Sequence, residues 1–221
     1  MTTLKNKKVL SSWSGGKDSC LALWRAHQAG AQVKALFTMF DEDGERSRSH
    51  GVRPEVMRAQ AAAMGLPLFT AEASWASYEG QFVAQLQRFA DDGVEAAVFG
   101  DIDLDAHREW EEKVCAAAGI EAALPLWQQP REALVREGLD AGIRALVVTV
   151  NTAMAPADLL GKTLTHELVD ELVAAGIDPC AEAGEFHTLV VDGPLFAAPL
   201  ALVAGEVHAH GDYRSLDLSL A

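Results

Sequence analysis

The sequence predicts an α/β protein built around a doubly wound parallel β-sheet. Short apolar or β-branched runs alternate with segments in which apolar residues recur at helical spacing. Glycines follow several of these helical segments, and a pair of glycines joins the first strand to the first helix. Such an alternation implies parallel β-α-β units, with helices covering both faces of one sheet.

The first half of the chain supplies the elements of that sheet. We expect strands at 8–14, 33–40, 66–71, 96–100 and 122–127, with helices at 18–27, 54–64, 82–92 and 110–118 between them. Ligands of doubly wound sheets bind beyond the carboxyl ends of the strands. The site is therefore expected in the loops that follow Trp13, Phe40, Gly100 and Leu126.

The alternation loosens after Pro130. A helix at 131–142, a strand at 145–150 and a longer helix at 156–176 are expected before a polar turn at 178–184. The remaining residues, 186–220, alternate apolar and polar side chains as antiparallel strands do. We place a soft domain boundary within residues 126–131.

The overall composition is that of a globular protein and narrows the classes of partner. Of the 221 residues, 49% are hydrophobic and 23% are charged, and the net charge is −14. Nucleic-acid binding needs Lys and Arg to neutralise phosphates, so this charge argues against a nucleic-acid partner. No apolar run reaches the ~18–20 residues that cross a bilayer. We expect a cytoplasmic protein without membrane contact, for which a homodimer is possible.

A phosphate-binding turn is predicted at the end of the first strand. Two glycines let backbone N–H groups approach an anion, and the next helix presents its unpaired N–H groups and the positive end of its dipole. The segment lacks the GxxxxGK[S/T] pattern of a Walker A loop, and a plain glycine turn capped by serine is the alternative. The candidate phosphate-binding residues are Ser12, Ser14, Gly15, Gly16, Lys17, Asp18 and Ser19, joined by Asp101 from the loop after residue 100.

Acidic residues follow the strand expected at 96–100. Asp101 stands at its carboxyl end, with Asp103 and Asp105 behind it and Arg108 at the start of the next helix. Carboxylates together with substrate phosphates are ligands that Mg²⁺ favours. Asp18 and Asp101 are therefore the candidate magnesium ligands, and Arg108 could face a phosphate. Helix capping by Asp105, with the other acids solvated, is the alternative.

A second polar cluster lies in the turn at 178–188. Glu182 and Glu185 stand three apart around a glycine, and His187 opens an apolar strand. This density of polar side chains suggests a chemical role, whereas an acidic surface turn with a structural histidine is the alternative. His50, in the polar segment 41–51, is a further candidate for contact with a substrate or nucleotide. The length and polarity of that segment would permit it to close as a lid.

The sequence Ser-Gly-Gly-Lys-Asp-Ser at 14–19 resembles the pyrophosphate loop of the PP-loop (N-type) ATP pyrophosphatases. Three later segments narrow the resemblance to the diphthine–ammonia ligase family, so that it runs from about residue 8 to about residue 196. These segments are Gly-Asp-Ile at 100–102 with Arg108, Leu-Pro-Leu-Trp at 124–127, and Glu-Ala-Gly-Glu-Phe-His-Thr at 182–188 followed by Asp-Gly-Pro at 192–194.

The resemblance implies a five-stranded parallel sheet of the adenine-nucleotide α-hydrolase type in an ATP-binding domain, residues 1–128, and a smaller α+β substrate domain, residues 129–221. It also implies that a substrate carboxylate is adenylated by ATP with release of pyrophosphate, and that ammonia then displaces AMP. The loop would hold the leaving pyrophosphate and Mg²⁺ would neutralise charge. Arg108, Glu182, Glu185 and His187 would be catalytic, with the glutamates orienting ammonia or accepting its proton.

The carboxylate substrate stays unidentified, as a small molecule or a protein side chain. Members that make diphthamide carry aromatic-Glu-Thr where this chain has Phe186, His187 and Thr188, and Ala181 replaces a glycine. The histidine form resembles bacterial members of uncertain substrate. Two other functions stay open. A tRNA-modifying PP-loop enzyme is disfavoured by the net charge and the lack of paired cysteines, and a non-catalytic adenine-nucleotide sensor would not need the second polar cluster.

Overall fold

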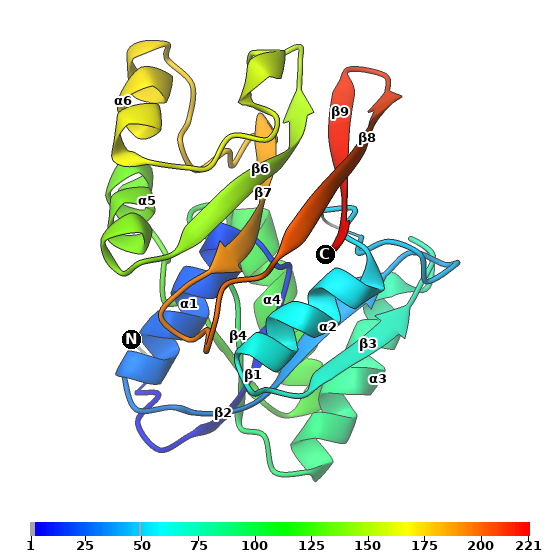
Figure 1. Cartoon of the computed structure of the whole chain (residues 1–221). Helices are drawn as coiled ribbons and strands as arrows, with labels where there is room; N and C mark the ends of the chain where they lie inside the picture. Colours follow the sequence, from blue (N-terminus) through cyan, green and yellow to red (C-terminus); the bar gives the residue numbers. More distant parts are fainter. Residues whose placement is uncertain (1–2, 49) are drawn as a thin grey trace.

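The structure is a computed structural model that describes residues 3–48 and 50–221 and contains two β-sheets (Figure 1). The first sheet is parallel and has the strand order β3-β2-β1-β4-β5. Its strands are β1 (Lys8–Ser12), β2 (Gln32–Phe40), β3 (Leu68–Glu72), β4 (Ala96–Val98) and β5 (Glu121–Ala123). The chain runs outward from β1 to β3 and then returns across β1 to β4, which confirms the doubly wound, five-stranded sheet.

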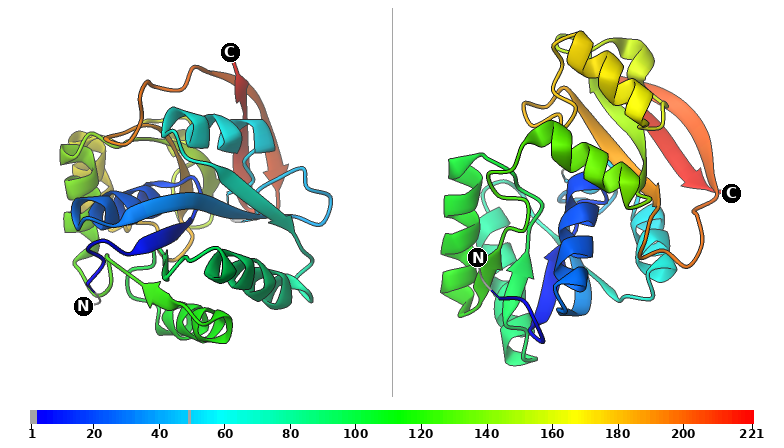
Figure 2. Two further views of the ribbon diagram at one scale, coloured as in Figure 1. Left: turned by 90° about the horizontal axis from the view of Figure 1, so that it is seen from below. Right: turned by 90° about the vertical axis from the view of Figure 1, so that its left-hand side faces the viewer.

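Helices cover both faces of this sheet. On β1, Val9 and Leu10 are fully buried, and because successive strand residues point to opposite faces they belong to two separate cores. The helices α1 (Lys17–Gln28) and α2 (Pro54–Ala63) contribute to the core that contains Val9, whereas α3 (Tyr78–Asp91) and α4 (Asp105–Ala118) contribute to the other. Figure 2 shows α2 and α3 on opposite sides of the sheet.

Gly100, just beyond β4, lets α1 come close to the end of the sheet. A Cβ built on Gly100 would lie 2.7 Å from the backbone nitrogen of Ser19 and 2.8 Å from the carbonyl carbon of Asp18. Both are backbone atoms of α1, so no side-chain rotation could relieve the overlap. The first turn of α1 and the loop after β4 therefore meet at the carboxyl ends of the central strands.

The second sheet is antiparallel and has the order β7-β6-β9-β8. It comprises β6 (Arg144–Asn151), β7 (Phe186–Asp192), β8 (Leu202–His210) and β9 (Tyr213–Leu220), with the helices α5 (Arg131–Asp140) and α6 (His166–Ala174) beside it. The antiparallel strands expected within 186–220 are thus confirmed. Among the residues that the structure describes, no helix has the length and apolarity needed to span a bilayer.

The prediction of a single helix at 156–176 is wrong. A short 3₁₀ turn, η1 (Ala157–Leu159), is followed by an extended stretch in which Thr163 forms an antiparallel bridge to Leu146 of β6. Gly161 has φ of +82°, which a right-handed helix does not accommodate. The helix α6 begins only after Thr165, whose side chain accepts a hydrogen bond from the Leu168 N–H at 3.2 Å.

A buried glutamine ties the glycine turn to the second sheet. Gln60 of α2 is fully buried, and its side-chain amide donates to the carbonyl oxygens of Gly15 at 3.0 Å and Val190 at 2.7 Å. Its own oxygen accepts from the indole of Trp13 at 2.9 Å. Val190 N–H also donates to the Gly15 carbonyl at 2.8 Å. The turn after β1 is therefore held by β7 as well as by its own sheet.

Candidate functional site

A cavity of about 490 Å³ opens at the carboxyl ends of β1 and β4 and is lined from both sheets. Of the residues that the sequence singles out, Ser12, Ser14, Lys17, Asp18, Ser19, Asp101, Glu182, His187 and His50 line it. Gly15, Gly16, Arg108 and Glu185 are not among its lining residues. The structure thus brings the glycine turn and the late polar cluster into one site, although they are far apart in the sequence.

The glycine turn is organised by short-range hydrogen bonds and by one contact from β7. Ser14 Oγ donates to Ser19 Oγ at 3.0 Å and accepts from Gly16 N–H at 3.3 Å. Lys17 N–H donates to Thr188 Oγ1 at 3.1 Å. Ser14, Lys17, Asp18 and Ser19 line the cavity, so the positive end of the α1 dipole borders it, which suits an anion.

Lys17 is a buried cation at this turn. Its ammonium donates to Asp18 Oδ2 at 2.7 Å and to the carbonyl oxygen of Cys180. Burial alone would lower the pKa of Lys17, but the charge of Asp18 and its hydrogen bond to the ammonium outweigh it and raise the pKa. Lys17 therefore keeps its charge and is available to a phosphate in the cavity.

The two glutamates of the late turn have different surroundings. Glu182 lines the cavity, and burial, followed by the charge of Asp18, raises its pKa to about 7. Glu185 is buried at 8% exposure, and its carboxylate accepts from Ala183 N–H at 3.1 Å within the turn itself. Glu182 is therefore positioned for acid–base chemistry, whereas the carboxylate of Glu185 shapes the turn that carries Glu182. A catalytic role for Glu185 stays a prediction.

Asp101 belongs to a cluster that the sequence did not reveal. His107 Nδ1 lies 2.7 Å from Asp101 Oδ1, and Glu111, which is only 3% exposed, lies beside the same carboxylate. Burial alone would raise the pKa of Asp101, but the hydrogen bond from His107 and the neighbouring Glu111 outweigh it and lower the pKa. Burial, together with Asp101, raises the pKa of Glu111 to about 11. Asp101 is therefore a carboxylate and Glu111 a neutral acid.

The neutral state of Glu111 predicts a pH-dependent stability. The ordinary pKa of its carboxyl is 4.5, so above that value the unfolded chain releases a proton that the folded chain keeps until about 11. The contribution of this group is full below 4.5 and is lost as pH rises toward about 11, by up to ~1.4 kcal/mol of unfolding free energy per pH unit. The side chain of Glu111→Gln can still donate to Asp101 but has no proton to release. We therefore expect this variant to show a smaller decrease of the unfolding free energy as pH rises. Urea unfolding at intervals between about pH 5 and about pH 8 measures it.

Glu109→Gln, an exposed position two residues earlier in α4, is the matched control and should keep the wild-type slope. Equal slopes for wild type and Glu111→Gln would show that Glu111 is ionised in the folded chain.

Arg108 lies away from the cavity in this structure. Its guanidinium carbon stands 4.9 Å from the centre of the Trp127 ring, and the side chain pairs with Asp105 at 3.5 Å. The turn after β5, in which Trp127 N–H donates to the Leu124 carbonyl at 3.2 Å, replaces the end of the strand expected at 122–127. The loop after Leu126, where ligand contact is expected from the sequence, does not line the cavity. A catalytic role for Arg108 stays a prediction.

An aromatic wall faces the polar half of the cavity. Trp75, Tyr78 and Trp110 line it, together with Arg48, whose guanidinium carbon lies 4.6 Å from the Trp75 ring centre. Arg48 comes from the segment after β2 and Trp75 from the loop after β3, while Tyr78 begins α3 and Trp110 lies in the second turn of α4. The rule that ligands bind beyond strand ends applies equally to β3, so an aromatic pair directly after that strand was a usable signal.

The acidic side chains fit a magnesium ion that arrives with a nucleotide. Asp18 and Asp101 both line the cavity and lie close enough for each to act on the other electrostatically. No group of three or more His, Cys, Asp or Glu side chains with the spacing of a metal site occurs among residues 3–48 and 50–221. Mg²⁺ ordinarily takes one or two carboxylates and completes its shell with phosphates and water. The donor set therefore suits Mg²⁺ bound with phosphates, and not an all-protein metal site. Asp103, by contrast, pairs with Arg131 at 2.7 Å.

Comparison with known proteins gives matches along most of the chain. The family described as diphthamide synthase N-terminal domain matches residues 7–122, and the diphthamide synthase C-terminal domain matches residues 130–219. The chain is 30% identical to the diphthine–ammonia ligase of Schizosaccharomyces pombe over 226 residues, which cover 92% of this chain and 37% of that protein. It is 29% identical to the diphthine–ammonia ligase of Danio rerio over 232 residues, which cover 93% and 90%.

The chain thus spans little more than a third of the length of the fission-yeast relative and most of the length of the fish relative. Among solved structures, it is similar to a predicted subunit of a tRNA methyltransferase from Methanocaldococcus jannaschii. The identity is 16% and the TM-score 0.46, over 85% of this chain and 97% of that one. A likeness at this level has no bearing on activity.

Proposed function

Because the chain belongs to the diphthamide synthase family, we propose that it is an ATP-dependent amide ligase, with a reaction like that of the diphthine–ammonia ligases among its relatives. One observation carries the proposal: the glycine turn and Glu182 line the same cavity. A nucleotide sensor needs the first of these and not the second. The proposal assigns ATP to residues 1–128 and the carboxylate substrate to residues 129–221.

The first step forms an acyl-adenylate. An oxygen of the substrate carboxylate attacks the α-phosphorus of ATP, the bond from that phosphorus to the bridging oxygen breaks, and pyrophosphate leaves. The ammonium of Lys17 and the positive end of α1 stabilise the charge that develops on the leaving group. Holding both reactants in one cavity supplies much of the remaining acceleration.

The second step forms the amide. Ammonia attacks the acyl carbon, the bond to AMP breaks, and the nitrogen gives up one proton. Glu182 accepts this proton, since a carboxyl with a pKa of about 7 is substantially ionised near neutral pH. His187 borders the same space, where burial, followed by the charge of Lys17, lowers its pKa and keeps the ring neutral.

The proposal also includes a bound Mg²⁺, a cellular compartment and an oligomeric state. Mg²⁺ would be held by Asp18 and Asp101 together with ATP, where it would neutralise phosphate charge. We place the reaction in the cytoplasm because it consumes ATP. A homodimer stays a prediction that light scattering after size-exclusion chromatography would check.

The proposal is tested by product analysis. The protein is incubated with ATP, Mg²⁺, ¹⁵N-labelled ammonium and a panel of carboxylic acids and carboxylate-bearing peptides. We expect AMP and pyrophosphate in equal amounts, and label in an amide, only when a suitable acceptor is present. ADP and phosphate as products would contradict the mechanism. Turnover that requires tRNA, or ATP binding without turnover, would favour the tRNA-modifying and sensor alternatives respectively.

A further inference from the structure

The imidazole of His50 lies against the glycine turn. A Cβ built on Gly16 would stand 2.4 Å from Cε1 of His50 and 3.1 Å from its Nδ1. The ring stacks on that of His187 with 5.0 Å between the centroids, and both rings line the cavity. Gly16 is the residue immediately before α1, where the positive end of the helix dipole suits a phosphate. His50 therefore borders the position that a phosphate would take.

The hydrogen bond of His50 fixes which ring nitrogen carries the proton. Nδ1 lies 2.9 Å from the carbonyl oxygen of Thr188. A carbonyl oxygen only accepts, so Nδ1 donates, and the neutral ring keeps a lone pair on Nε2. Within the described part of the chain Nε2 has no hydrogen-bond partner, whereas Nδ1 has one. Because Cε1 is bonded to both nitrogens, Nε2 is one bond from the ring atom nearest Gly16.

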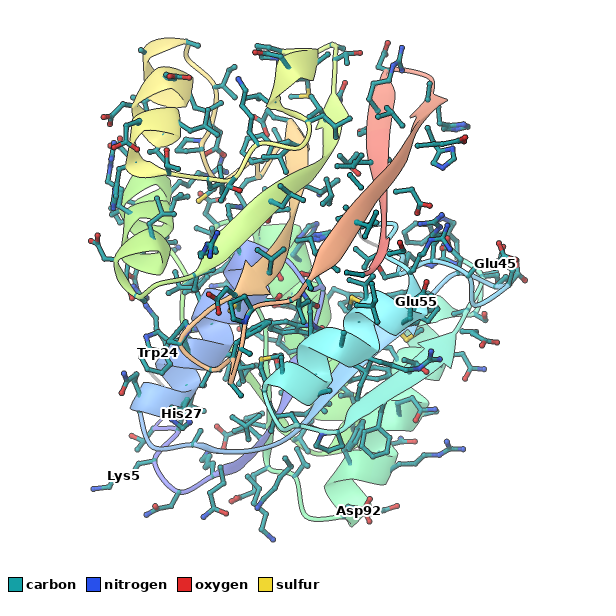
Figure 3. All side chains as sticks on the ribbon, in the orientation of Figure 1. Lys5, Trp24, His27, Glu45, Glu55 and Asp92 are labelled. Atoms are coloured by element: carbon teal, nitrogen blue, oxygen red, sulfur yellow. The ribbon has the colours of Figure 1, made fainter. Side chains whose placement is uncertain are left out.

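Two arginines fix the segment that carries His50. Arg46 Nη1 and Arg53 Nε both donate to Asp217 Oδ1 of β9, at 2.7 and 2.9 Å. The Asp217 side chain is only 12% exposed, and hydrogen bonds from Arg53, then from Arg46, hold its pKa below the usual range. Arg46 also donates to the carbonyl oxygen of Gly51 at 3.2 Å. The second sheet thus holds the segment on both sides of His50. Glu45, which directly precedes Arg46, is labelled in Figure 3.

We propose that His50 is a phosphate ligand of the glycine turn, through a proton shared between Nε2 and an oxygen of a terminal phosphate of ATP, and that Asp217 positions it. The inference rests on the proposed function in one respect, the use of residues 14–19 as the phosphate site. A neutral Nε2 and a deprotonated phosphate oxygen are both acceptors, so they meet only with a proton between them. Whichever of the two holds it, phosphate binding takes up a proton.

The surroundings of the ring explain why free His50 does not hold that proton. Burial, followed by the nearby His187, lowers the pKa of His50 to about 3, and the ammonium of Lys17 acts in the same direction. Lys17 comes from α1 and His187 from β7, and these are the titratable groups that face the ring. A bound polyphosphate places several negative charges beside the His50 ring, and these charges raise the pKa of the ring. Phosphate binding and protonation are therefore coupled.

Titration calorimetry with pyrophosphate, in two buffers of different ionisation enthalpy, tests the contact with His50. We expect His50→Ala to bind pyrophosphate about tenfold more weakly, as befits one charge-assisted hydrogen bond. His50→Gln should retain affinity, because its amide N–H donates without an added proton. The wild-type affinity should fall between about pH 6 and about pH 8 more steeply than that of His50→Gln, with a larger proton uptake.

Equal pH slopes and equal proton uptake in wild type and His50→Gln would overturn the role of His50. If the wild-type protein bound neither pyrophosphate nor ATP, the proposed function would fail first, which the same titrations distinguish.

A double-mutant cycle tests the positioning role of Asp217. Asp217→Asn keeps the size of the side chain but removes the charge that both arginines bind. We expect it to weaken pyrophosphate binding several-fold in the wild-type background and not at all in the His50→Ala background. Asp212→Asn, in the exposed turn of the same hairpin, is the control and should leave binding unchanged. Equal losses in both backgrounds would show that Asp217 acts only on general stability.

Discussion

Replacing Gly16 by valine is expected to abolish pyrophosphate release from ATP. The added Cβ would meet the His50 ring at 2.4 Å and the carbonyl oxygen of Thr188 at 3.2 Å. That oxygen is backbone of β7 and cannot rotate away, so the turn itself has to move away from the phosphate position. Hydrogen bonds to charged oxygens contribute about 1.5–3 kcal/mol each. Displacing the turn should therefore weaken ATP binding by at least about 100-fold, as measured by equilibrium dialysis.

Gly80→Val is the matched control for this loss. Gly80 lies in the exposed first turn of α3, and a Cβ built there would meet nothing within 4 Å. We expect it to bind ATP as the wild type does, and both variants should melt cooperatively by circular dichroism. Wild-type ATP affinity in Gly16→Val would move the nucleotide site away from the glycine turn.

Glu182→Gln is expected to slow amide formation by about 10²–10⁴-fold, the usual contribution of a proton acceptor. ATP–pyrophosphate exchange, which reports only the adenylation step, should change little. Burial and the charge of Asp18 raise the pKa of Glu182 to about 7, so its basic form is lost as pH falls through that value. The wild-type rate, divided by the concentration of free ammonia, should therefore fall below about pH 7, whereas the variant should lack this limb.

Glu206→Gln provides the control for the charge change. Glu206 lies on β8, is exposed and is distant from the lining of the cavity. It should retain both the amidation rate and its pH dependence. If Glu182→Gln lowered exchange and amidation equally, Glu182 would act in the adenylation step, and another group would have to accept the proton from nitrogen.

The parallel sheet follows from local patterns in the sequence. Strand and helix periodicities, and glycines such as Gly119 that end a helix in the left-handed conformation, act over a few residues and can be read without neighbours. The prediction of a helix at 156–176 is wrong because the structure of this segment depends on residues outside it. Its apolar spacing fits a helix, but Thr163 pairs with Leu146 of β6 and Gly161 turns the chain. Pairing with a distant strand outweighs the local preference there.

In the candidate site, too, some features follow from the local sequence and others depend on tertiary packing. The residues of the glycine turn share one local structure, so the sequence placed them correctly at the end of β1. Glu111 reads as an ordinary solvated helix glutamate, and only the packing of α4 beside Asp101 makes it a buried neutral acid. Glu182 and Glu185 look equivalent in the sequence. The fold of their turn sends one carboxylate to the cavity and the other to the N–H of Ala183.

The sequence by itself determined the strand–turn–helix unit at residues 8–28, the alternation that builds the parallel sheet, and the residue types from which the proposed pyrophosphate site is built. These depend on backbone geometry and on side chains a few positions apart. Only the tertiary structure decided which groups face one another across the cavity. The position of His50 beside Gly16 and the hydrogen bonds of Asp217 to the arginines of that segment both depend on how β7 and β9 pack against the first sheet. Burial and charge at such contacts depend on distance in space, because electrostatic and desolvation effects act without regard to separation along the chain.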